Sequence, residues 1–156
     1  MALTFTVDEK DPKKIFLKGS INEDASPEQV FEKLHGDLVI NLEQIERVNS
    51  IGIHKWILAI SAFTKSRKII FEGLPYSLAV QARAVLNLFG TAKVVSIMSP
   101  YYCEKCEMHH LVMVTYSALK ASLNHVPIAK CPKCLGEMEF DELPGYFDLL
   151  RTAGGG

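Results

Sequence analysis

The first 102 residues of this 156-residue chain contain no cysteine, and all four cysteines lie between positions 103 and 134. The chain also has no apolar run near the roughly 20 residues that a membrane-spanning helix needs. Acidic residues at Asp8 and Glu9 stand where a signal sequence would be apolar. We therefore expect a cytoplasmic protein without a membrane partner, and its reduced thiols then favour metal ligation over disulfides.

The chain has little net charge of either sign. Residues 1–99 carry 12 Lys or Arg and 11 Asp or Glu, whereas residues 100–156 carry 5 and 7, for a formal total of −1. Because phosphate contacts need clustered Lys and Arg, this balance argues against nucleic acid as a partner. The sequence also has no phosphate loop, no G-x-S-x-G and no H-E-x-x-H, so we predict a protein that is not an enzyme.

The four cysteines form two C-x-x-C pairs, Cys103 with Cys106 and Cys131 with Cys134. Two thiolates three positions apart on a tight turn can reach one ion, and two such turns supply a closed tetrahedral zinc site. Gly136 suits the second turn, where backbone N–H groups can bond the sulfurs. The pattern thus predicts a structural zinc ion with no ligand position left for catalysis.

Strands are expected around these pairs, as in a zinc ribbon. The 24 residues between Cys106 and Cys131 contain an apolar strand over residues 111–116 and a short helix over 118–124. Another strand follows the second pair over residues 137–141. We assign residues 99–156 to a four-cysteine zinc ribbon with a C-terminal tail, whose apolar segment includes Tyr146, Phe147, Leu149 and Leu150.

Two other chemistries accept the same cysteines. Four thiolates can hold an iron–sulfur cluster as well as zinc. The sequence Cys131-Pro132-Lys133-Cys134 also has the spacing of a redox-active pair, although such pairs open the first helix of their fold and this one lies late in the chain. His109, His110 and His125 are further potential ligands that four thiols make unnecessary.

Residues 1–98 alternate between strand and helix patterns in the order β-β-α-β-α-β-α-β. The strands are expected over residues 3–7, 14–18, 38–42, 68–72 and 93–98. The helices are expected from Ser26 to Gly36, from Ser50 to Thr64, and over residues 76–88. Strands joined by helices imply parallel neighbours, so the fold class is α/β with one mixed sheet and helical cover.

This arrangement resembles the STAS domain, the fold of bacterial anti-sigma factor antagonists. The resemblance rests on the strand Leu38-Val39-Ile40-Asn41-Leu42 and the turn Asn49-Ser50-Ile51-Gly52 that opens a helix. In the family this turn is Asp-Ser-x-Gly, and partner kinases phosphorylate its serine. Asn49 stands where the family usually has Asp, and the first cysteine pair begins where the family has its last helix.

The resemblance implies a non-enzymatic regulatory module that binds a signalling protein such as an anti-sigma factor or a kinase. Ser50 is its candidate phosphorylation site, with Asn49 and Gly52 shaping the switch turn. A phosphate on Ser50 would lie at the positive end of a helix. The simpler reading makes Ser50 the residue that caps this helix, with Gly52 allowing close backbone packing.

The alternative function is that of a zinc-ribbon adaptor that binds nucleic acid. Lys105, Lys120, Lys130 and Lys133 could form a local basic patch.

Overall fold

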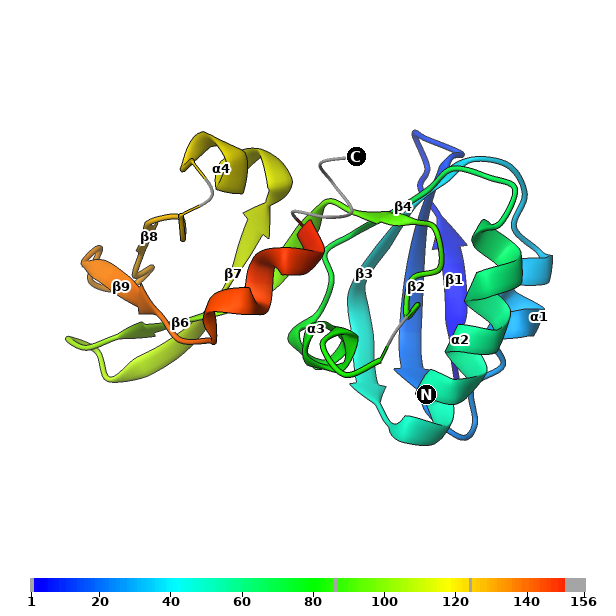
Figure 1. Cartoon of the computed structure of the whole chain (residues 1–156), viewed down its shortest axis with the longest axis horizontal. Helices are drawn as coiled ribbons and strands as arrows, with labels where there is room; N and C mark the ends of the chain where they lie inside the picture. The colour runs from blue at the N-terminus through cyan, green and yellow to red at the C-terminus, as the bar shows by residue number, and fades with distance from the viewer. Residues whose placement is uncertain (1, 86, 124, 151–156) are drawn as a thin grey trace.

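The computed structural model describes residues 2–85, 87–123 and 125–150, and it consists of two β-sheets placed side by side (Figure 1). The first sheet has the order β1-β2-β3-β4-β5. Its strands are β1 (Thr4–Val7), β2 (Lys14–Ile21), β3 (Leu38–Val48), β4 (Ile69–Glu72) and β5 (Lys93–Val94). Strands β1 and β2 are antiparallel and the remaining pairs are parallel, so the expected mixed α/β sheet is confirmed.

Three helices accompany this sheet: α1 (Pro27–Glu32), α2 (Ser50–Thr64) and α3 (Tyr76–Ala82). The predicted order of strands and helices is therefore confirmed. Helices α1 and α2 cover one face of the sheet, whereas α3 lies on the side that faces the second sheet (Figure 1).

The core of the first unit lies between the sheet and helices α1 and α2. Trp56 of α2 is fully buried, its ring centroid 5.3 Å from that of Phe31 and 5.9 Å from that of Phe71. Its indole Nε1 donates a hydrogen bond to the carbonyl of Leu88 at 2.7 Å, which satisfies the one polar atom of the ring.

Two strands are longer than the sequence pattern indicated. Strand β3 was expected to end at Leu42, because Glu43, Gln44 and Glu46 break the apolar run, but it continues to Val48. Pairing supplies the reason: β2 itself extends to Ile21, and Ile21 pairs with Val48. Backbone hydrogen bonds to β2 thus keep Glu43, Gln44 and Glu46 in a strand, although their polar side chains do not predict one.

The third helix is shorter than expected. It ends at Ala82 rather than at residue 88, and the chain continues in turns with Asn87 and Gly90 at φ angles of 63° and 57°. Of the expected helices and tail, Leu86, Asn124 and residues 151–156 lie outside the described residues.

The second sheet has the order β7-β6-β9-β8. Its strands are β6 (Ser96–Cys103), β7 (Met108–Thr115), β8 (Ala129–Lys130) and β9 (Glu137–Phe140), accompanied by α4 (Tyr116–Ala121) and the short 3-10 helix η1 (Pro144–Phe147). The strands expected after each cysteine pair are present. We call residues 96–150 the ribbon unit and residues 2–94 the sheet unit.

The strand expected over residues 93–98 is divided between the two sheets. Val95 stands at the division: its N–H donates to the carbonyl of Phe71 at 3.0 Å, and its carbonyl accepts from the N–H of Tyr116 at 2.8 Å. Ser99 and Pro100, where the composition shifts, therefore lie inside β6 rather than between elements. The domain bounds 1–98 and 99–156 remain a prediction.

A polar and aromatic joint connects the ribbon unit to α3. The Tyr76 hydroxyl donates to Glu142 Oε2 at 2.5 Å, and the Arg83 guanidinium pairs with Glu142 Oε1 at 2.6 Å. The Tyr146 hydroxyl donates to the carbonyl of Met98 at 2.5 Å, with its ring centroid 6.0 Å from that of Tyr76. The apolar tail around Tyr146 thus packs between the two units.

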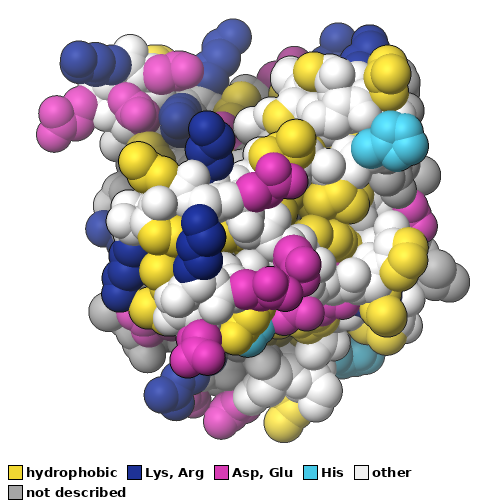
Figure 2. All heavy atoms as spheres, turned by 90° about the vertical axis from the view of Figure 1, so that its left-hand side faces the viewer, with side chains coloured by type: hydrophobic (Ala, Val, Ile, Leu, Met, Phe, Trp, Pro, Cys, Tyr) yellow, Lys and Arg dark blue, Asp and Glu magenta, His cyan; other side chains and the backbone are white. Residues whose placement is uncertain are grey.

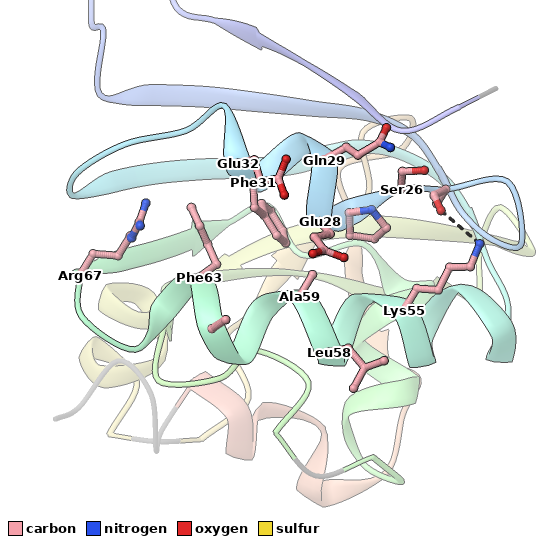
Figure 3. A pocket seen from close by; sticks show the side chains of 13 residues that line it. Ser26, Glu28, Gln29, Phe31, Glu32, Lys55, Leu58, Ala59, Phe63 and Arg67 are labelled. Carbon is pink, nitrogen blue, oxygen red and sulfur yellow. Dashed lines mark hydrogen bonds between the residues drawn. The ribbon is translucent and has the colours of Figure 1, made fainter.

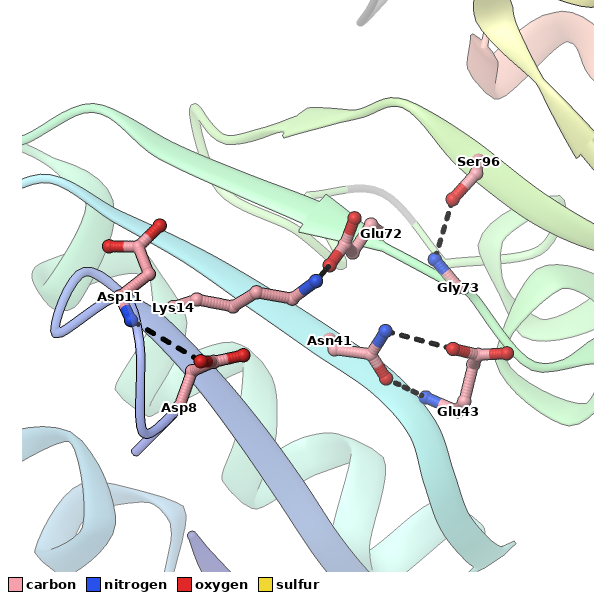
Figure 4. A network of polar contacts seen from close by, with 8 residues as sticks. All are labelled: Asp8, Asp11, Lys14, Asn41, Glu43, Glu72, Gly73 and Ser96. Atoms are coloured by element: carbon pink, nitrogen blue, oxygen red, sulfur yellow. Dashed lines mark hydrogen bonds and ion pairs between the residues drawn. The ribbon is translucent and has the colours of Figure 1, made fainter. Parts of the chain in front are cut away.

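The sheet face away from α1 and α2 carries a network of polar contacts (Figure 4). Lys14 spans from β2 to Glu72 of β4 at 3.0 Å, and buried Asn41 bonds both the backbone and the side chain of Glu43. At the edge nearest the ribbon unit, Ser96 Oγ accepts the N–H of Gly73 at 2.7 Å.

None of the helices in the described part of the chain is long and apolar enough to cross a membrane.

Candidate metal centre

The four cysteines lie on two tight turns at one end of the ribbon unit. Cys103 ends β6 and Cys106 lies in the turn to β7, whereas Cys131 follows β8 and Cys134 lies in the turn to β9. Strand β9 pairs with β6 through Tyr101–Phe140 and Tyr102–Glu139. Since both turns extend from these paired strands, the sheet register places the two cysteine pairs opposite each other.

The sulfur atoms are spaced as a single tetrahedral ion requires. All four Sγ atoms lie within 4.8 Å of one another. Cys103 Sγ is 3.5 Å from Cys134 Sγ, and Cys131 Sγ is 3.8 Å from Cys106 Sγ. A tetrahedron with metal–sulfur bonds of about 2.3 Å has sulfur–sulfur edges of about 3.8 Å, whereas a disulfide is about 2.05 Å long. The cysteines can therefore hold one metal ion.

Backbone N–H groups surround the sulfurs. Cys103 Sγ accepts from the N–H of Cys106, Cys131 Sγ from that of Lys133, and Cys134 Sγ from that of Gly136, each at 3.4 Å. These bonds orient the ligands and stabilise their negative charge. The expected N–H contact from Gly136 is thus present. The left-handed backbone, however, falls on Glu107 and Leu135, with φ angles of 52° and 61°.

Gly136 is needed because a side chain would come too close to its neighbours, and not because of its dihedral angles. A Cβ at this position would lie 3.3 Å from Cys134 Sγ and 3.5 Å from the Lys105 side chain. The glycine therefore lets the backbone approach a ligand sulfur, which is what its N–H contact requires.

The thiols of the pairs differ in acidity. The N–H groups of Cys134 and Lys133 lower the pKa of Cys131 to about 6. The hydrogen bond with the Cys134 side chain, followed by burial, raises the pKa of Cys106 to about 12. Because the metal-binding form of cysteine is the thiolate, a bound metal ion would take the place of the thiol protons.

One histidine lies next to the four cysteine sulfurs. His110 Nε2 lies 3.7 Å from Cys131 Sγ, because β7 pairs with β6 and places His110 opposite Tyr101. The exposed His109 instead pairs with Asp141 at 2.7 Å. The spacing of the cysteines does not predict this proximity of His110. The antiparallel register of β6 and β7 could have indicated it.

The Ser50 turn lies elsewhere, at the start of α2 in the sheet unit (Figure 1). Helix α2 runs over Ser50–Thr64, as predicted, but its capping residue is Asn49, whose Oδ1 accepts the N–H of Gly52 at 2.9 Å. The expectation that the Ser50 hydroxyl caps the helix is therefore wrong. Ser50 is the first helical residue, and its side chain is exposed.

The other two residues of the turn have clear structural roles. Asn49 Nδ2 donates to Glu23 Oε2 at 2.5 Å, a bond that an aspartate could not make. A Cβ on Gly52 would overlap the backbone of Ile21 and Asn22. The expected close packing at Gly52 is thus present.

No family model, curated protein or solved structure matches this chain.

Proposed function

We propose that this protein is a non-enzymatic regulatory module that binds a partner protein, and that a structural zinc ion holds its ribbon unit in shape. The single observation that carries the zinc assignment is the clustering of four cysteine Sγ atoms within 4.8 Å. Four thiolates complete a tetrahedral shell, which leaves the ion no open position for a substrate.

The spacing favours one ion over an iron–sulfur cluster. A cluster separates its cysteine sulfurs by several metal and sulfide atoms, whereas here all four Sγ atoms lie within 4.8 Å of one another and two pairs are 3.5 and 3.8 Å apart. Elemental analysis of the purified chain tests this: one zinc per chain is expected. Stoichiometric iron with sulfide would contradict it, and Cys134→Ser should lower the zinc content of the protein.

The grouping of all four sulfurs disfavours a redox pair. The four Sγ atoms lie within 4.8 Å of one another, as ligands of a shared ion would. A disulfide within Cys131-Pro132-Lys133-Cys134 would withdraw two of these four ligands.

Ser50 is the proposed regulatory residue. Its side chain is exposed at the first position of a 15-residue helix, where the free N–H groups and the helix dipole favour a phosphate. Phosphorylation would add about −1.5 to −2 charges near Glu23, which already faces Asn49. The added repulsion would alter this end of α2 and any surface that depends on it.

Affinity purification of the wild-type chain, Ser50→Ala and Ser50→Asp tests the regulatory role. The expected result is a protein partner whose recovery differs between Ser50→Asp and Ser50→Ala. Equal recovery with all three forms, together with no Ser50-dependent phosphate in cells, would refute it.

The nucleic-acid alternative receives less support. Glu104, Glu107, Glu137 and Glu139 are all exposed on or next to the cysteine turns. On the end of the molecule shown in Figure 2, Lys and Arg side chains are interspersed with Asp and Glu rather than gathered into a patch. Such a surface does not follow a phosphate backbone.

A further inference from the structure

A groove runs along the outer side of α1 and α2, away from the cysteines and from the ribbon unit (Figure 3). Its volume is about 620 Å³. The lining is apolar at its centre, where Phe31, Ala59 and Phe63 meet, and Leu58 stands at its edge with 66% of its surface exposed. Ala59 is one turn from Phe63, so a small side chain leaves room beside a large one.

The charged residues around this groove are of two kinds. The cations are already engaged: Lys55 Nζ donates to the carbonyls of Glu23 and Ala25, and Arg67 donates to the carbonyl of Leu34 and stacks 4.6 Å from the Phe63 ring centroid. The anions are not. Glu28 and Glu32 lie one helical turn apart on α1, exposed, and neither carboxylate has an ion-pair or hydrogen-bond partner among the described residues.

An apolar floor with two unpaired carboxylates on one rim specifies the chemistry of an occupant. It must present apolar side chains to Phe31, Ala59 and Leu58 and place cations opposite Glu28 and Glu32. An amphipathic helix does both, since residues four apart in sequence lie on one face and match the spacing of the two glutamates. Two parallel ridges with a small residue between them also accept a third helix by ordinary ridge-into-groove packing.

We propose that this groove binds the apolar face of a basic amphipathic helix from a partner protein. The proposal rests on the partner-binding role given above and assigns it a surface. Phosphate-bearing ligands are disfavoured, because Glu28 and Glu32 would repel them and the donors of Lys55 and Arg67 already bond backbone carbonyls. A second copy of the chain does not fit either: among the four described α-helices, only α2 and α4 contain a Lys or Arg, and each contains one.

Fluorescence anisotropy with two labelled synthetic peptides tests the groove on the full chain. One peptide has about 14 residues of Leu and Lys in amphipathic helical spacing, and in the other every Lys is replaced by Glu. The Leu/Lys peptide is expected to bind the wild-type protein at least tenfold more tightly than the Leu/Glu peptide. Glu28→Lys/Glu32→Lys should reverse the preference, and Leu58→Asp should weaken binding of the Leu/Lys peptide by about tenfold.

A charge-matched variant separates the groove from general electrostatic attraction. Glu9→Lys/Glu139→Lys changes the net charge equally at exposed positions outside the groove, and it should leave the affinity for the Leu/Lys peptide within about twofold. If this variant loses as much affinity as the groove variant, or if both peptides bind alike, the proposal is overturned. Thermal unfolding of each variant verifies that the fold is retained.

The outcome is also distinguishable from failure of the proposed function. If a partner is recovered in a Ser50-dependent manner but the two peptides bind the chain equally well, the groove is not the binding surface. The regulatory role of Ser50 then stands without it. Recovery that Glu28→Lys/Glu32→Lys abolishes and Glu9→Lys/Glu139→Lys leaves unchanged supports both.

Discussion

The two units of this chain solve the problem of stability in different ways. Of the twelve largest fully buried side chains, ten precede Val95 and two, Tyr101 and Phe147, belong to the ribbon unit. Conversely, seven of the ten exposed large hydrophobic side chains described lie in the ribbon unit, among them Leu123, Ile128 and Leu135. The sheet unit buries its apolar residues between a sheet and helices, whereas the ribbon unit leaves many of its own in water.

This difference explains why the cysteines occur in only one of the two units. A small sheet without helical cover on both faces removes too little apolar surface from water to offset the entropy of ordering its chain. A metal ion held by the four cysteines would supply the missing free energy through a few strong bonds. The sheet unit has no need of it, and no cysteine precedes position 103.

Removal of the metal is the strongest test of this contrast. In small structural sites zinc binding contributes on the order of 10 kcal/mol, so chelation or Cys103→Ser should unfold most of the ribbon unit. The sheet unit should keep its core around Trp56. Amide NMR spectra would then lose the signals of β7 and β9 and keep those of β2 and β4. Loss of both sets together would show that the units fold as one.

Gly52 provides the largest expected effect in the sheet unit. Because a Cβ would overlap the backbone of Ile21 and Asn22, Gly52→Ala should lower the free energy of unfolding by about 3 kcal/mol. Gly36→Ala is the matched control, since a Cβ there meets nothing within 4 Å and only the φ of 79° opposes it. That variant should cost about 1 kcal/mol. Urea unfolding followed by Trp56 fluorescence measures both, and equal costs would remove the steric argument.

The Glu142 joint tests how firmly the two units are attached. The hydrogen bond from Tyr76 is the main cause that lowers the pKa of Glu142 to about 2, from an ordinary value of 4.5. The ionised carboxylate therefore stabilises the folded protein above about pH 4.5, and this contribution is lost as the pH falls toward about 2. Glu142→Gln should cost about 1 to 2 kcal/mol at neutral pH.

Acid also releases metal from thiolates, so the informative quantity is the difference between wild type and Glu142→Gln at each pH. This difference should shrink between about pH 4.5 and 2, the window set by the ordinary and lowered pKa values. A constant difference across that range would mean that the carboxylate charge does not hold the joint.

The smallest effect is expected at the ion pair between His109 and Asp141. Both side chains are more than half exposed, at 63% and 56%, so solvent screens their attraction. Asp141→Asn should change the free energy of unfolding by less than about 0.5 kcal/mol. A larger loss by thermal denaturation would show that this contact between β7 and the end of β9, which spans β6, is more important to the ribbon unit than its exposure indicates.

Much of the sheet unit could be predicted because its signals are local. The apolar spacing of Ile53, Trp56 and Ile60 defines α2, whose two ends agree with the expected ones. The extension of β3 to Val48 could not be predicted, since it depends on pairing with β2 and not on its own polar residues. Likewise the bond from Asn49 Nδ2 to Glu23 could not be predicted, because Glu23 is 26 positions away in the sequence.

For the metal centre, the spacing of the cysteines was sufficient to predict the cluster, because a C-x-x-C turn fixes two sulfurs locally. The cysteine spacing could not predict which side chains pack around the cluster. The approach of His110 to Cys131 follows from the strand register. Glu142 contacts Tyr76 and Arg83, which lie 66 and 59 positions away in the sequence. Such contacts arise only once both sheets are formed.

The connection between the two units is stiff. Val95 is the only residue between β5 and β6; its N–H bonds the carbonyl of Phe71 in β4, and its carbonyl bonds the N–H of Tyr116 at the start of α4. Leu74, which follows β4, bonds the backbone of both Ser96 and Met98 in β6. A rotation of the ribbon unit would therefore have to break backbone hydrogen bonds, and a force applied to the cysteine end is transmitted to β4 rather than absorbed by a linker.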